Sequence, residues 1–79
     1  MGVRRVLRKI LEKEVSEEYL LDIKKYFHTT LSETTHLGVA DKQLINRIVD
    51  EVYQKNSETE MPVKQFINLV EVEIYKYRF

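Results

Sequence analysis

The chain of 79 residues has no cysteine, only two glycines and one proline, and no long hydrophobic run. Without cysteine it can form no disulfide, no cysteine-based zinc site and no thiol nucleophile, a composition that suits a reducing cytoplasm. No apolar run exceeds four residues, so we expect neither a membrane-spanning helix nor the core of a signal peptide. The scarcity of glycine and proline favours long helices and leaves no glycine-rich loop for binding phosphate.

An excess of charge is missing as well, because 13 Lys and Arg residues match 13 Asp and Glu residues. A general nucleic-acid-binding protein needs surplus cations to release counterions from phosphate, so we expect no nucleic acid as a partner. The length allows one domain, which we place at residues 1–79. Its core is modest, since a chain of this size buries only roughly 60% of the surface of its unfolded form.

The first segment has apolar residues at the spacing of one helical face, and basic residues on the other side. The apolar positions are Val3, Val6, Leu7, Ile10, Leu11 and Val15, and the cations are Arg4, Arg5, Arg8, Lys9 and Lys13. Such a basic helix can make a weak contact with a membrane surface. The alternative, which we favour, is a bundle helix whose polar face is simply solvated.

The second segment also predicts a helix. Ser16 is its expected N-cap, with the hydroxyl accepting a backbone N–H and with acidic residues in the first turn. Gly38 is its expected end, in a conformation with positive φ, and the connection to the next helix is placed at residues 35–40. The apolar face of this helix consists of Leu20, Ile23, Phe27 and Leu31.

Two further helices are predicted in the second half. Asp41 is expected to cap the third, residues 55–60 form a polar connection, and Pro62 suits the first turn of the fourth. The third helix has an apolar face of Leu44, Ile45, Ile48, Val49, Val52 and Tyr53, and the fourth one of Val63, Phe66, Ile67, Val70, Ile74 and Tyr77. The alternation from residue 70 to 74 is also typical of a strand, but no second strand is available to pair with it. We therefore predict an all-α fold, a small antiparallel four-helix bundle.

The sequence offers little catalytic chemistry. His28 and His36 are the only histidines, and no third ligand stands at helical spacing from both. Adjacent carboxylates diverge on a helix, and residues 54–65 lack the ligands of a calcium-binding loop. We therefore predict no catalytic residue, no metal and no cofactor, and a protein that is not an enzyme.

The C-terminus is the most suggestive surface. Aromatic side chains next to arginine are typical of the residues that dominate binding energy at protein interfaces, and the candidates here are Tyr75, Tyr77, Arg78 and Phe79. The alternative is that two of the three aromatic rings fold back onto the core. Leu69 and Val72 lie off the main apolar stripe of the fourth helix and also suggest a surface for a partner.

The third and fourth helices resemble a known family. The run Leu44, Ile45, Asn46, Arg47, Ile48, Val49, followed by Tyr53, a polar connection, Met61 and Val63, is similar to the immunity proteins of class IIa (pediocin-like) bacteriocins, of the enterocin A immunity type. Asp22 and Ile23 keep a similar spacing upstream, and the resemblance covers residues 19–75.

The resemblance implies a non-catalytic cytoplasmic bundle, peripheral to the inner face of the membrane, that protects a bacterial cell from a membrane-permeabilising peptide. In this family the partner is the complex of the peptide with its receptor, the mannose phosphotransferase permease, and specificity lies in the C-terminal half. By position, that half corresponds to residues 61–79 with their aromatic end. The other hypothesis is a small regulatory protein-interaction module of phage or plasmid type, with a homodimer as one form. The sequence leaves the oligomeric state open.

Overall fold

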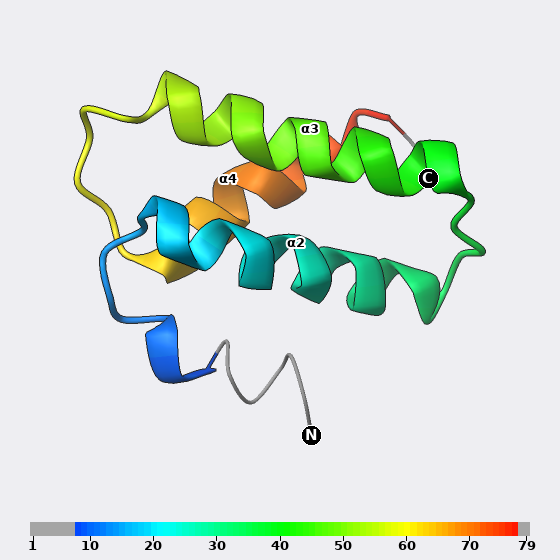
Figure 1. The fold of residues 1–79 in the computed structure, drawn as a ribbon, viewed down its shortest axis with the longest axis horizontal. Helices are drawn as coiled ribbons and strands as arrows, with labels where there is room; N and C mark the ends of the chain where they lie inside the picture. The colour runs from blue at the N-terminus through cyan, green and yellow to red at the C-terminus, as the bar shows by residue number, and fades with distance from the viewer. Residues whose placement is uncertain (1–7, 78–79) are drawn as a thin grey trace.

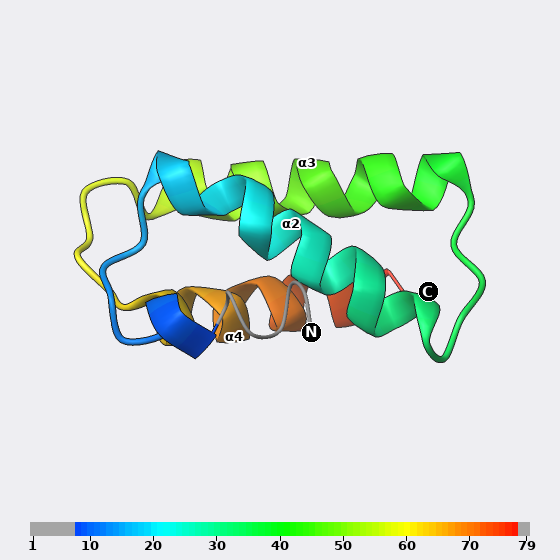
Figure 2. The ribbon, with the colours of Figure 1, turned by 60° about the horizontal axis from the view of Figure 1, so that its bottom comes forward.

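A computed structural model describes residues 8–77. Three helices, α2 (Glu17–Ser32), α3 (Val39–Lys55) and α4 (Val63–Tyr75), follow a helical turn at residues 8–10 (Figure 1). Both α2 and α4 pack against α3, and each runs opposite to it along the chain (Figures 1 and 2). The prediction of a small all-α bundle is confirmed. The start of the predicted first helix, residues 3–7, lies outside the described residues.

The core forms where the apolar faces of the three helices meet. The largest fully buried side chains are Ile23 from α2, Ile45 and Val49 from α3, and Val63, Phe66 and Val70 from α4. The Tyr53 ring meets the Phe66 ring edge to face, with 6.2 Å between the ring centroids. An ion pair also joins α2 to α3, because Lys24 Nζ lies 2.9 Å from Asp50 Oδ1. The apolar stripes predicted for these helices are therefore the ones that pack, except at Tyr77. The prediction for Tyr77 is wrong, because α4 ends at Tyr75 and the Tyr77 side chain is 52% exposed.

The first predicted helix is wrong for residues 11–15. Within the described chain it ends at Ile10. A turn follows, with Lys13 N–H bonded to Ile10 O at 2.9 Å, and Glu14 then forms an isolated bridge with Pro62 at the start of α4. The first N–H groups of a helix have no partner within that helix, and here the preceding segment supplies acceptors for them. Val63 N–H donates to Lys13 O at 2.7 Å, and Lys64 N–H donates to Leu11 O at 3.0 Å. A third backbone bond runs in the other direction, from Val15 N–H to Met61 O at 2.9 Å.

The connection between α2 and α3 also differs from the prediction. The second helix ends at Ser32, and Gly38 is the N-cap of α3 with a φ of −82°, so it neither ends α2 nor needs a positive φ. Asp41 does cap α3, but from inside its first turn, where Asp41 Oδ2 accepts a bond from Gly38 N–H at 3.1 Å. Ser16 holds the predicted N-cap position of α2, yet its hydroxyl makes no capping bond.

The last segment is helical as predicted. Pro62 is the N-cap of α4, and the helix continues through residues 70–74 to Tyr75, so the strand alternative is wrong. The strand-like alternation there arises because Val70 and Ile74 face the core while Val72 lies on the opposite side of the helix, 56% exposed.

Candidate functional site

The side of α4 that faces away from the core carries three apolar side chains. Leu69 is 36% exposed, Val72 56% and Tyr75 71%. In a monomeric helical bundle, the side of a helix that faces away from the core normally carries polar residues. We call the exposed positions of α4 and its C-cap the outer face of α4, which consists of Lys64, Gln65, Asn68, Leu69, Val72, Tyr75 and Lys76.

Two lysines and two glutamates give α4 and its C-cap no net charge. Lys64 and Lys76 are exposed, while Glu71 and Glu73 flank the outer face, and the Glu73 side chain is 35% exposed. Lys76 Nζ lies 3.2 Å from Glu73 Oε1, in a pair whose lysine side chain remains 64% exposed. A solvent-exposed pair of this kind contributes little stability, so the lysine can exchange its partner at small cost.

The predicted binding residues at the C-terminus lie at one end of the bundle. Tyr75 and Tyr77 are both exposed, at 71% and 52%, and Arg78 and Phe79 lie outside the described residues. The alternative in which two of the three aromatic rings fold back onto the core is therefore wrong, because two of them are already at the surface. The C-terminal end of α4 lies in the same half of the molecule as the α2–α3 connection (Figures 1 and 2), where Val39 is 75% exposed.

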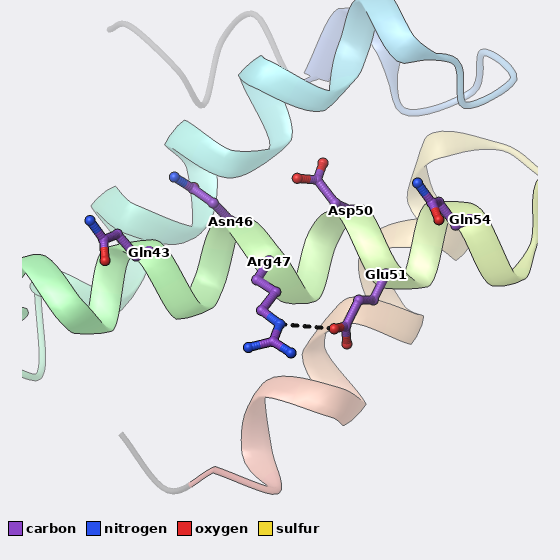
Figure 3. A pocket seen from close by; sticks show the side chains of 6 residues that line it. All are labelled: Gln43, Asn46, Arg47, Asp50, Glu51 and Gln54. Atoms are coloured by element: carbon purple, nitrogen blue, oxygen red, sulfur yellow. Dashed lines mark hydrogen bonds and ion pairs between the residues drawn. The ribbon is translucent and has the colours of Figure 1, made fainter.

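A second surface feature is a shallow polar hollow of about 360 Å³ on α3. Figure 3 shows its six side chains, Gln43, Asn46, Arg47, Asp50, Glu51 and Gln54, all on one side of this helix. Its charges are already paired, since Arg47 Nε lies 3.0 Å from Glu51 Oε1 and Asp50 binds Lys24. These six side chains include no histidine and no hydroxyl group.

Acidic side chains line a third feature, a hollow of about 370 Å³ near the start of α4. Glu12, Glu14 and Glu60 surround it together with Met61 and Pro62. Across residues 8–77, no group of three or more His, Cys, Asp or Glu side chains is arranged to hold a metal ion. His28 is half-buried on α2 and His36 is exposed in the next connection, so these two histidines lie on different segments.

Within residues 8–77, no helix combines the length and the apolar character needed to cross a bilayer.

Sequence reasoning found Leu69, Val72, Tyr75 and Tyr77, but it missed Val39 and Leu21, which are 75% and 60% exposed. The prediction places Val39 in the connection at residues 35–40. Leu21 follows Leu20, which is partly buried against the core, in a run of three apolar residues. The absence of acidic residues from the exposed positions of α4 could have been predicted from the residues that lie opposite the core stripe of this helix.

Comparisons with protein-family models, with curated proteins and with solved structures find no match for this chain.

Proposed function

We propose that this protein is a non-catalytic immunity protein that protects a bacterial cell from a pediocin-like bacteriocin. The observation that carries the proposal is the exposed aromatic surface at the C-terminal end of α4, formed by Tyr75 and Tyr77. It lies in the half of the chain where the resemblance to the immunity proteins places specificity. The all-α bundle formed by the described residues belongs to the fold class that this resemblance implies.

The proposed mechanism is occlusion at the cytoplasmic face of the membrane. The protein binds the complex of receptor permease and bacteriocin and blocks it from permeabilising the cell, without sequestering free peptide. Tyr75 and Tyr77, with Arg78 and Phe79 after them, serve as anchors, because large aromatic side chains lose little conformational entropy for the contact area that they provide. The 13-residue helix α4, packed against a buried core, ends at Tyr75 and fixes the position of that anchor.

The test is a gain of resistance. A strain sensitive to pediocin-like peptides is transformed with this gene or with an empty vector, and survival is measured against a panel of such peptides. We expect survival to rise for at least one peptide. Purified protein added to the medium should give no protection, because occlusion requires the inner face. An absence of protection against every peptide would refute the proposal, and equal protection from outside would refute the occlusion mechanism.

The second candidate, a regulatory interaction module in homodimeric form, is favoured by a different observation. Leu69 and Val72 expose apolar surface at the middle of α4, where a second copy could pack. Light scattering over a range of concentrations discriminates the two candidates. A mass that rises to twice that of the 9.5 kDa chain supports the module, and a constant monomer mass excludes its homodimeric form.

A further inference from the structure

The start of α4 is capped by a distant part of the chain. Its N-cap residue, Pro62, makes no capping bond through its side chain and has no backbone N–H. The free donors of the first turn are Val63 N–H and Lys64 N–H, and they bond to the carbonyl oxygens of Lys13 and Leu11 at 2.7 Å and 3.0 Å. By contrast, α3 is capped from within its own first turn. The order of the first turn of α4 therefore depends on a segment about fifty positions earlier (Figures 1 and 2).

This capping segment, residues 8–15, is anchored by few side chains, and we call it the strap. Of its eight residues only Ile10 is buried, at 7% exposed, while Leu11 and Val15 are partly buried against the core. In α4, five of 13 residues are buried. The other strap residues are charged and exposed, namely Arg8, Lys9, Glu12, Lys13 and Glu14. A segment with so few buried apolar contacts opens at a lower free energy than the rest of a fold.

The core of the three helices is built without the strap. Its six largest fully buried side chains all belong to α2, α3 and α4. The contacts of the strap with α4 are concentrated in one short antiparallel bridge at Glu14 and Pro62, with backbone bonds on both sides of it. Bonds so close together along both segments break together, and the packing of α2 and α4 on α3 does not require them.

We propose that the strap is a conformational device that opens and closes as one unit on the folded three-helix core. When closed, it caps α4. When open, it releases Val63 N–H and Lys64 N–H together with the carbonyl groups of residues 11 and 13, so the first turn of α4 loses its cap. A molecule that binds only the open form shifts the population toward it. The proposal goes beyond the immunity function, because it concerns the opposite end of α4 from Tyr75 and requires neither a bacteriocin nor a permease.

The first test is native-state hydrogen exchange of the original protein, followed residue by residue by nuclear magnetic resonance at low urea concentrations. The amides of Val15, Val63 and Lys64 should share one protection factor, at least about tenfold below those of Val49 and Val70 in the core. Their exchange should hardly depend on urea, because opening the strap exposes little surface, whereas exchange in the core should depend on it steeply.

Two results of this experiment would overturn the proposal. If the three amides have the same protection and urea dependence as Val49 and Val70, the strap opens only when the whole chain unfolds. If Val63 and Lys64 exchange readily while Val15 keeps the protection of the core, the first turn of α4 frays alone and the strap does not open as a unit.

The second test holds the strap open in the full-length chain. Ile10→Asp puts a charge at its one buried position, and Lys9→Asp makes the matched change at the exposed neighbouring position. We expect Ile10→Asp to remove at least about nine-tenths of the protection of Val63 and Lys64 while Val49 stays protected and unfolding stays cooperative. Lys9→Asp should change their protection by less than about twofold.

Full protection of Val63 and Lys64 in the folded Ile10→Asp variant would contradict the proposal, since the anchor of the strap would then lie elsewhere. If Ile10→Asp unfolds the whole chain, the urea dependence of exchange in the original protein decides the question.

Discussion

Ile74 and Tyr75 are neighbours at the C-terminal end of α4, but one is buried and the other is exposed. Truncating each of them in turn to alanine tests which of the two side chains belongs to the core. The Ile74 side chain is 2% exposed and the Tyr75 side chain 71%. Truncating a buried isoleucine to alanine costs about 2–5 kcal/mol of unfolding free energy, because apolar burial is lost and a cavity remains. An exposed side chain without structural partners changes that free energy by less than about 0.5 kcal/mol.

These costs are large relative to the stability of so small a protein. At about 0.05–0.15 kcal/mol per residue, a chain of this length is stable by roughly 4–12 kcal/mol. Ile74→Ala should therefore lower the melting temperature by about 10 °C or more, at about 4–8 °C per kcal/mol for a domain of this size. Tyr75→Ala should leave it within about 4 °C of the original protein.

Urea unfolding followed by far-ultraviolet circular dichroism measures both free energies. The slope of free energy against urea should be the same in all three proteins, because the surface exposed on unfolding hardly changes. If Tyr75→Ala destabilised the protein as much as Ile74→Ala, the Tyr75 ring would be a core group, and the binding surface proposed for it would be lost.

Two further predictions concern the α2–α3 region. Gly38→Ser should raise the unfolding free energy by a few tenths of a kcal/mol to about 1 kcal/mol, because serine is a better N-cap than glycine and has less conformational freedom in the unfolded chain. Urea unfolding measures this free energy. A loss of stability would mean that position 38 needs a positive φ. The ion pair between Lys24 and Asp50, at 2.9 Å with side chains 21% and 50% exposed, should give a coupling of about 0.2–1 kcal/mol in a double-mutant cycle of Lys24→Met and Asp50→Asn. That coupling should shrink in 1 M salt, where the screening length is about 3 Å, and a coupling unaffected by salt would contradict the exposure of the pair.

The core of α3 and α4 could be predicted from the sequence because it follows from local periodicity. Ile45, Ile48 and Val49 recur at helical spacing, and the same spacing from Val63 to Ile74 outweighs the short alternation that suggested a strand. The exposed aromatic end was only one of two alternatives that the sequence left open. Tyr77 continues the helical spacing of the core stripe, and its exposure follows from the end of α4 at Tyr75, which no local pattern shows.

Two other features depend on contacts that no local pattern shows. The non-helical course of residues 11–15 depends on backbone bonds to residues 61–64, about fifty positions away in the chain. Leu11 and Val15 remain partly buried in this arrangement, so their apolar character agreed with a helix that does not form there. The sequence predicts the end of α2 too late, at Gly38. A glycine between two helices can be the N-cap of the second helix as readily as it can end the first one.

The role of the exposed aromatic surface is tested most directly by protection measured in living cells. A sensitive strain producing equal amounts of the original protein, of Tyr75→Ala combined with Tyr77→Ala, or of Leu21→Ala is exposed to the bacteriocin against which the original protein protects. We predict that the double variant loses protection while keeping its helical circular dichroism and melting temperature, and that Leu21→Ala protects fully. Full protection by the folded double variant would contradict the assignment of function to this surface.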